Sequence, residues 1–129
     1  MLDASAVVEW LLDLPLAREV AARLAPDDQT LHAPHLLSVE VAQVVRRYVA
    51  AGDVSAERGT HALTDLADLD VVHYPDEPLL PTMWRLRSNL TAYDAAYVAL
   101  ALALDAPLVT LDARIAAAPV HGATVDVIQ

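Results

Sequence analysis

Residues 90–112 read LTAYDAAYVALALALDAPLVTLD, and this stretch carries the clearest structural signal in the chain. Its apolar segment from Tyr93 to Leu104 predicts a strongly apolar helix. The segment that follows, from Pro107 to Thr110, predicts a short strand that ends just before Asp112. A helix followed by a short apolar strand is typical of an α/β fold.

The same alternation continues on both sides of this stretch. Apolar spacing and turn residues predict helices through Ser5–Leu12 and at Leu16–Leu24, His35–Ala51, Ser55–Leu66, Glu77–Arg87 and Ala113–Ala118. Further strands are expected at Met1–Asp3, Thr30–Ala33, Asp70–Tyr74 and Val125–Ile128. This order predicts a three-layer α/β/α fold with a mainly parallel central sheet. No repeat or linker interrupts the pattern, so we expect residues 1–129 to form a single domain.

Proline, glycine and serine mark several of the expected helix ends. Pro34 is expected to open the long helix, and Gly52 to close it. Ser55 is expected to cap the next helix. Pro81 lies inside the segment Glu77–Arg87, so the true start of that helix is expected nearer the proline.

Glu40 is a carboxylate where the local pattern asks for a hydrocarbon side chain. Leu36, Glu40 and Val44 form one i, i+4 row along the apolar stripe of the long helix. Because an isolated buried carboxylate is costly, Glu40 must be paired, protonated or bound to a cation. The chain has no lysine, and its basic residues are eight arginines. A buried pair with an arginine, or a different helix phase, remains the alternative.

Three aspartates, Asp3, Asp94 and Asp112, each lie where a strand ends or a helix begins. Each has a structural explanation as a helix cap: Asp3 together with Ser5, Asp94 through its spacing from Thr91, and Asp112 ahead of its helix. Active sites of parallel sheets, however, lie beyond the carboxyl ends of the strands, which Asp3 and Asp112 follow.

A divalent cation would explain all four acidic residues at once. Mg²⁺ prefers oxygen ligands and usually takes only one or two carboxylates directly. Such an ion lowers the pKa of a bound water and stabilises the departing oxygen of a phosphodiester. Without it, carboxylates so close together would repel one another, and at least one pKa would rise.

Composition and charge narrow the possible classes. Hydrophobic residues make up 56% of the chain, so long disordered stretches are not expected. The formal charge of −10 argues against broad electrostatic attachment to nucleic acid or membranes, and it would attract a basic partner. We find no secretory signal and no transmembrane segment, and the absence of cysteine fits a cytoplasmic protein.

Four motifs in order resemble those of a PIN-domain ribonuclease of the VapC toxin type, found in bacterial toxin–antitoxin pairs. The N-terminal LDASAVV at 2–8 resembles the opening strand of the family with its first acid, Asp3, followed by Ser5. The segment LSVEVAQVV at 37–45 holds Glu40, and LTAYDAAYVALA at 90–101 holds Asp94 in the most distinctive motif. The segment LVTLD at 108–112 resembles the fourth motif, in which Ala113 and Arg114 follow Asp112 without a further acid.

This resemblance implies endonucleolytic cleavage of RNA that depends on Mg²⁺ or Mn²⁺, with Asp3, Glu40, Asp94 and Asp112 around the metal. It also implies a cognate antitoxin that wraps the toxin, and a toxin homodimer. Ser5 and Thr110 would orient carboxylates or waters; helix capping is their structural alternative. Arg114, close to Asp112, is the best candidate for a residue that contacts substrate or neutralises an acid.

Other residues carry weaker signals. Arg46, Arg47, Arg85 and Arg87 fit a solvated helix face better than a phosphate site. Tyr93 and Tyr97, at i and i+4, are interpreted as packing residues. The five histidines, His32, His35, His61, His73 and His121, show no metal-ligand spacing.

Two further functions stay open at this stage. The first is a catalytically weak or inactive PIN-fold module that mainly binds its antitoxin. The second is a DNA nuclease, because the acids do not distinguish the two sugars. A phosphoacceptor receiver domain is set aside, since that fold needs a lysine and the chain has none.

Overall fold

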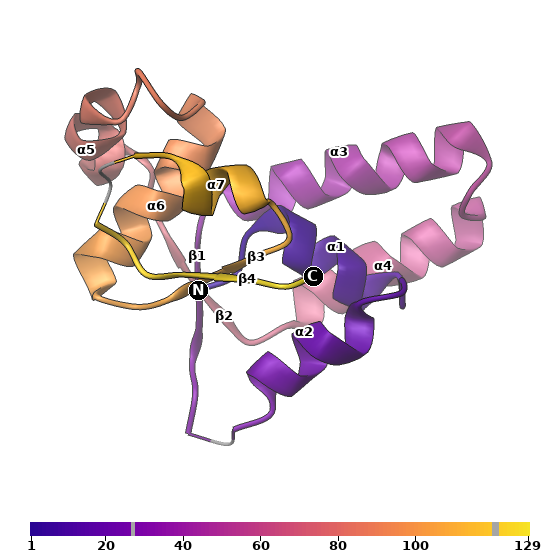
Figure 1. Ribbon diagram of the computed structural model, residues 1–129. Helices are drawn as coiled ribbons and strands as arrows, with labels where there is room; N and C mark the ends of the chain where they lie inside the picture. Colours follow the sequence, from indigo (N-terminus) through magenta and orange to yellow (C-terminus); the bar gives the residue numbers. More distant parts are fainter. Residues whose placement is uncertain (27, 120–121) are drawn as a thin grey trace.

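The computed structural model describes residues 1–26, 28–119 and 122–129. Helices alternate with short strands along the chain (Figure 1). The elements are α1 (Ala4–Leu11), α2 (Ala17–Leu24), β1 (Leu31–Pro34), α3 (Leu36–Ala51), α4 (Ala56–Asp68), β2 (Val71–Tyr74), the 3₁₀ turn η1 (Glu77–Leu79), α5 (Leu80–Arg85), α6 (Ala92–Leu104), β3 (Leu108–Thr110), α7 (Ala113–Ala117) and β4 (Val125–Val127).

The strands form two parallel pairs, which the N-terminal residues join. Strand β1 pairs with β2, and β3 pairs with β4. Leu2 forms a parallel bridge with Val109 of β3, and its N–H donates to the His32 carbonyl of β1 at 3.5 Å. The spatial order is therefore β2-β1-Leu2-β3-β4, and the β1–β2, Leu2–β3 and β3–β4 pairings are parallel, as expected from the alternating pattern.

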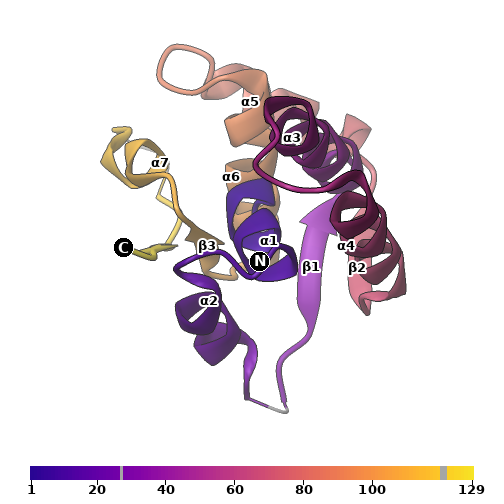
Figure 2. The same cartoon turned by 90° about the vertical axis from the view of Figure 1, so that its right-hand side faces the viewer.

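Helices cover both sides of these strands. In Figure 1, α1 to α4 lie to the right of the strands, and α5 and α6 lie to the left. Helix α1 packs against α2, α3 and β3, whereas α6 packs against α5, β1 and β3. Figure 2 shows the same molecule after a quarter turn, with the β1 arrow pointing toward the side where α3 begins. The α/β/α prediction is confirmed.

The hydrophobic core lies between α1, α3 and α6 and the strands they cover. Val7 and Val8 of α1 pack in the same buried cluster as Leu37 and Val41 of α3. Helix α6 is buried along most of its length, from Ala95 to Ala101. Burial of this apolar surface stabilises the fold by roughly 25 cal/mol for each Å² removed from water.

Two expectations near the N-terminal side of the sheet are wrong. The predicted strand Met1–Asp3 is reduced to the single bridge at Leu2, because Asp3 already caps α1 by accepting a hydrogen bond from the Ala6 N–H. Pro34 does not open the long helix; it ends β1 opposite Tyr74. The N–H of His35 then continues the ladder to the Tyr74 carbonyl at 2.8 Å, so α3 begins only at Leu36.

The segment predicted as one helix over Glu77–Arg87 is two elements, η1 and α5, which follow one another. Helix α5 begins at Leu80, with Pro81 in its first turn as expected. The other predicted helix ends are confirmed: Gly52 closes α3 with φ of 81°, and Ser55 caps α4. Local sequence signals therefore fixed most boundaries to within about two residues.

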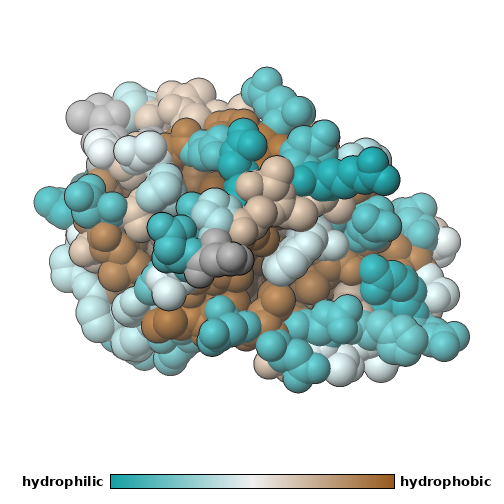
Figure 3. All heavy atoms as spheres, turned by 90° about the horizontal axis from the view of Figure 1, so that it is seen from below, coloured by the Kyte–Doolittle hydropathy of each residue, from teal (hydrophilic) through white to brown (hydrophobic). Residues whose placement is uncertain are grey.

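Figure 3 shows the lower face of the molecule, on which polar side chains are mixed with several apolar patches. Among the described residues, the exposed large hydrophobic side chains are Val39, Leu63, Val72, Leu80, Trp84 and Tyr93. Within the same described part of the chain, each helix is too short or too polar to cross a membrane.

Candidate active site

The four predicted acids come from four different elements. Asp3 follows Leu2 and is the N-cap residue of α1. Asp112 follows β3 and is the N-cap residue of α7. Glu40 lies in the second turn of α3, and Asp94 in the first turn of α6. Asp3 and Asp112 therefore also act as helix caps, as in the structural alternative. Asp94 takes part in a cap as well, because its N–H donates to the Thr91 hydroxyl.

Asp3 is the most deeply buried of these acids, with 6% of its surface exposed. One oxygen accepts from the Ser5 hydroxyl at 2.6 Å and the Ala6 N–H at 3.0 Å, and the other accepts from Thr110. Burial raises the pKa of Asp3, although these hydrogen bonds act in the opposite direction. Its carboxyl group is thus fixed in orientation by side chains from two distant parts of the sequence.

Glu40 is half-buried, so it lies at the edge of the apolar stripe of α3 and not inside the core. Its Oε2 accepts a hydrogen bond from the Tyr97 hydroxyl at 2.6 Å. Burial raises the pKa of Glu40, the Tyr97 hydrogen bond lowers it, and the negative charges of Asp3 and Asp94 raise it further. The alternative of a pair with an arginine is not found among the described residues, where Tyr97 is the hydrogen-bond partner of Glu40.

Asp94 and Asp112 are held by local partners. The Thr91 hydroxyl donates to Asp94 Oδ2 at 2.9 Å. Asp112 accepts from the Nε atom of Arg114 at 2.9 and 3.1 Å and also from its terminal nitrogen, so the guanidinium group grips both carboxylate oxygens. This ion pair lowers the pKa of Asp112.

Thr110 connects the first and fourth acids. Besides donating to Asp3, its hydroxyl oxygen accepts the Asp112 N–H at 2.9 Å. Ser5 also accepts the Leu111 N–H at 3.0 Å, so both hydroxyls hold the turn after β3 against the start of α1. Their positions fit the orienting role expected of them.

The four acids are linked by electrostatic interactions. The charges of Asp3 and Asp94 raise the pKa of Glu40. The charge of Asp94 also raises the pKa of Arg114, whose guanidinium binds Asp112. As the side chains stand, no three His, Asp or Glu residues in the described part of the chain converge on one point as a ready-made metal cage. The acids therefore form an electronegative group without a fully closed coordination shell.

The sequence interpretation missed the role of Tyr97. We expected only packing from it, yet its hydroxyl donates to Glu40; burial, followed by this hydrogen bond, raises the pKa of Tyr97. Its spacing of three residues from Asp94, one turn along α6, was the signal that could have indicated it. The packing role predicted for Tyr93 is wrong, because its side chain is 60% exposed.

The remaining basic residues and histidines lie elsewhere. Arg87 stacks over the Trp84 ring at 4.7 Å, and His32 bonds to Thr30 and Tyr74. His121 falls outside the described residues.

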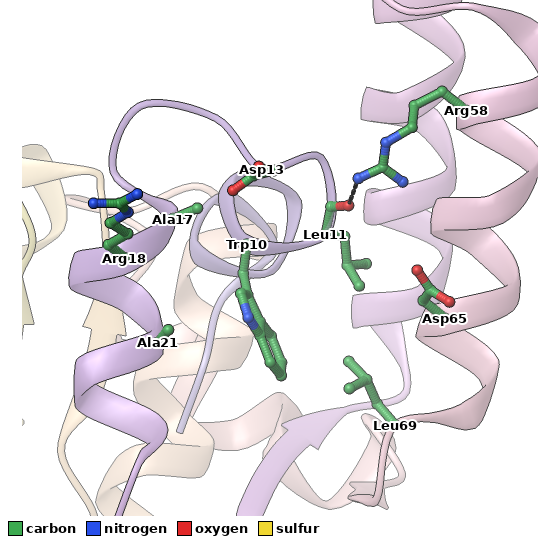
Figure 4. A pocket seen from close by; sticks show the side chains of 9 residues that line it. All are labelled: Trp10, Leu11, Asp13, Ala17, Arg18, Ala21, Arg58, Asp65 and Leu69. Atoms are coloured by element: carbon green, nitrogen blue, oxygen red, sulfur yellow. Dashed lines mark hydrogen bonds between the residues drawn. The ribbon is translucent and has the colours of Figure 1, made fainter.

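A cavity of about 470 Å³ is lined by none of the four acids. Figure 4 shows it between α1, α2 and α4, with Arg58 donating to the Leu11 carbonyl at its rim. Its lining mixes Arg18 and Arg58 with Asp13 and Asp65. This cavity is therefore separate from the acidic group.

Comparison with known proteins supports the resemblance noted in the four motifs. The family model described as "PIN domain" matches residues 1–120. Ribonuclease VapC1 of Mycobacterium tuberculosis is 44% identical over 120 residues, which cover 92% of this chain and 90% of the relative. Ribonuclease VapC12 of the same species is 38% identical over 128 residues, with 99% and 98% covered.

A more distant relative, Ribonuclease VapC3 of Pyrobaculum aerophilum, is 32% identical over 121 residues, which cover 90% of this chain and 91% of the relative. The matches therefore extend over nearly the whole length of both proteins, and the span of the family model includes the positions of the four acids. This chain belongs to the PIN-domain family.

Proposed function

We propose that this protein is a metal-dependent endoribonuclease and the toxin of a type II toxin–antitoxin pair. The observation that carries the proposal is the acidic group itself: Asp3, Glu40 and Asp94 come from three different helices or helix ends, and they lie close enough for the charges of Asp3 and Asp94 to act on Glu40. Such concentrated negative charge is a feature of sites that hold a cation. The names of the related proteins, VapC ribonucleases, support the same reaction.

The donor set fits Mg²⁺ or Mn²⁺. All four candidate ligands, Asp3, Glu40, Asp94 and Asp112, offer oxygen atoms, and histidine and cysteine do not contribute. Because Mg²⁺ usually takes one or two carboxylates directly and completes its shell with water, a tight cage of three side chains is not required. When bound, the ion would lower the pKa of a water and neutralise charge on a phosphodiester.

The residues around these acids have distinct tasks in the proposed reaction. Ser5 and Thr110 fix the orientation of the Asp3 carboxylate, and Tyr97 fixes that of Glu40. Arg114 forms an ion pair with Asp112, and its side chain is 88% exposed and so accessible to a substrate. We assign it the task of exchanging Asp112 for a phosphate of the RNA.

The proposal extends to the partners. A basic antitoxin suits a chain with a net charge of −10, and a homodimer is expected by analogy with the family. We propose that residues 1–129 form a single PIN-like domain. We further propose that it acts in the cytoplasm, where it would meet RNA and its antitoxin.

Asp94→Asn tests the reaction directly. The variant keeps the Thr91 hydrogen bonds, because an asparagine oxygen also accepts, but it removes a charge from the acidic group. We expect at least a hundredfold loss of Mn²⁺-dependent RNA cleavage and loss of growth arrest, with an unchanged melting temperature.

Asp105→Asn is the matched control. Asp105 ends the same helix with φ of 48°, a conformation that asparagine tolerates well. This variant should cleave RNA like the original protein. Equal activity of the Asp94→Asn variant and the control would contradict the proposal.

A weak or inactive module that mainly binds an antitoxin is the second candidate. The bidentate hold of Arg114 on Asp112 favours it, since this acid is already neutralised. One assay distinguishes the two candidates. If the protein is a ribonuclease, it cleaves RNA in the presence of Mn²⁺; if it is an inactive binding module, it does not.

A further inference from the structure

A second cavity adjoins the acidic group and shares Glu40 with it. This cavity has a volume of about 420 Å³ and opens along α3, with Tyr93 of α6 and Ala4 of α1 at its sides. We call it the α3 pocket. Its volume falls in the range of small-ligand sites.

The walls of the α3 pocket suit a flat, largely apolar group. Leu36 and Val44 contribute half-buried side chains, and Val39 is 70% exposed. Tyr93, 60% exposed, lines this pocket together with Glu40, so it borders the acidic group. An exposed aromatic ring offers a stacking surface to any nucleobase, whatever its sequence.

The charges along the α3 pocket run from negative to positive. Glu40 lies at one end, and Arg47, seven residues further along α3, lies about 10 Å away along the helix axis. Within the described residues, the Arg47 guanidinium has no hydrogen-bond or ion-pair partner. An RNA strand would meet a metal-binding group at one end and a cation for its next phosphate at the other.

We propose that the α3 pocket binds one nucleobase of the RNA, next to the phosphodiester that is cleaved, with its face on Tyr93 and the adjoining phosphate at Arg47. This inference rests on the proposed ribonuclease function and adds a base subsite to it. A single-stranded RNA is required, because a base must leave its helix to enter the pocket. A stable protein occupant would cover Glu40 and thereby close the acidic group to substrate.

Variants of Tyr93 test the stacking surface. The substrate is a single-stranded RNA that contains the cleavage site of the original protein, together with two analogues that are abasic on one or the other side of that site. We expect Tyr93→Leu to lower kcat/KM for the intact RNA by about 5- to 100-fold, and Tyr93→Phe to restore most of it. On the analogue that lacks the base bound by the pocket, Tyr93→Leu should not lower kcat/KM any further.

Two exposed valines provide a matched pair. Val39→Ala removes part of the pocket wall and should raise KM, whereas Val72→Ala, on β2, should leave kcat and KM unchanged. Arg47→Gln should weaken binding and reduce its dependence on salt, since one phosphate contact is lost.

A binding assay separates the two proposals. Fluorescence anisotropy with Asp94→Asn protein and the same RNAs reports the pocket without cleavage. Binding that depends on Tyr93, together with an original protein that does not cleave RNA in the presence of Mn²⁺, would support the subsite and overturn the ribonuclease proposal. Cleavage that is indifferent to Tyr93 and to the abasic positions would overturn the subsite alone.

A protein occupant gives a different result. If a second copy covers the α3 pocket, Tyr93→Leu and Val39→Ala should change the sedimentation coefficient and leave cleavage per protomer unaltered. That outcome, or the absence of both binding and cleavage, would overturn the inference.

Discussion

At the scale of single residues, the acidic group is organised by neutral hydroxyl donors. Ser5, Thr110 and Tyr97 each donate to a carboxylate, and Thr110 also accepts from the backbone of Asp112. Hydrogen bonds to a carboxylate favour its charged form, whereas burial and neighbouring negative charges disfavour it. For Asp3 and Glu40 the second influence is the stronger, and their pKa values are raised.

Arg114 competes with any cation for Asp112. In Arg114→Ala protein the Asp112 carboxylate is released, so we expect Mn²⁺ to bind about 2- to 5-fold more tightly in calorimetric titrations. Arg23→Ala, which breaks the surface ion pair with Asp126, serves as the control and should leave Mn²⁺ affinity unchanged. Weaker Mn²⁺ binding after Arg114→Ala would show that the arginine supports the site and does not compete for it.

Glu40 makes stability depend on pH. Its pKa is raised above the ordinary value of 4.5 in the folded state, so the unfolded chain loses this proton first as pH increases. The folded protein is therefore favoured below pH 4.5 and loses stability as pH rises through the raised pKa. Glu40→Gln removes this loss while its amide oxygen still accepts from Tyr97.

We expect the metal-free Glu40→Gln protein to match the original at pH 4 and to melt about 2 °C higher at pH 7, after allowance for partial exposure. Thermal melts in EDTA between these pH values measure the difference. A gap that narrows as pH increases would contradict the assigned pKa shift.

At the scale of elements, the contact between α3 and α4 depends on a glycine. A Cβ atom on Gly59 would lie 2.9 Å from Val49 Cγ2 and 3.3 Å from Val45 Cγ1. Because β-branched side chains in a helix have little rotamer freedom, neither valine can move aside cheaply.

Gly59→Ala should therefore lower the free energy of unfolding by about 1 kcal/mol, despite the better helix propensity of alanine. Urea denaturation of Gly59→Ala, Val49→Ala and the double variant measures the coupling between the two sites. The double variant should lose less than the sum of the single changes. Strict additivity would mean that the helices separate without strain.

Sequence signals predicted these elements well where the determinants are local. Ser55, Thr91 and Gly52 occupy the helix ends that their chemistry favours. The prediction that Pro34 starts a helix was wrong because the residues on both sides of it pair with strand β2. A local sequence pattern does not reveal such a pairing.

The site shows the same division. Asp94 and Asp112 were placed by short motifs, but the bond between Tyr97 and Glu40 joins residues 57 apart. Helical spacing assigned Tyr97 to packing, since periodicity reports which face is apolar and not which polar tip finds a partner.

At the scale of the whole molecule, Leu2 is the joint between two strand pairs. It is 2% exposed, bridges to Val109, and donates to His32 over 3.5 Å. The connection toward β3 is stronger, because Asp3 and Met1 add hydrogen bonds of 3.2 and 2.9 Å to Val109. The backbone of Leu2 thus joins the β1–β2 pair to the β3–β4 pair, and its side chain is buried at this joint.

Leu2→Ala should cost about 3 kcal/mol in the free energy of unfolding, through lost burial and a cavity at this joint. Leu63→Ala, a leucine 37% exposed on α4, should cost less than 1 kcal/mol. Hydrogen exchange provides a second measurement: the Val109 amide should exchange faster in Leu2→Ala protein. Equal losses in the two variants would mean that the strand pairs are joined elsewhere.

The bond between Thr110 and Asp3 spans 107 positions of the sequence, which has a consequence for biosynthesis. Asp3 is translated early, but the Thr110 hydroxyl that donates to its carboxylate is synthesised only when most of the polypeptide is finished. Nascent chains and prematurely terminated fragments that lack β3 cannot bring the first and fourth acids together. Translation must therefore proceed beyond β3 before the acidic group is complete, so under the proposed function the ribosome that makes this protein is not exposed to an assembled site during most of elongation.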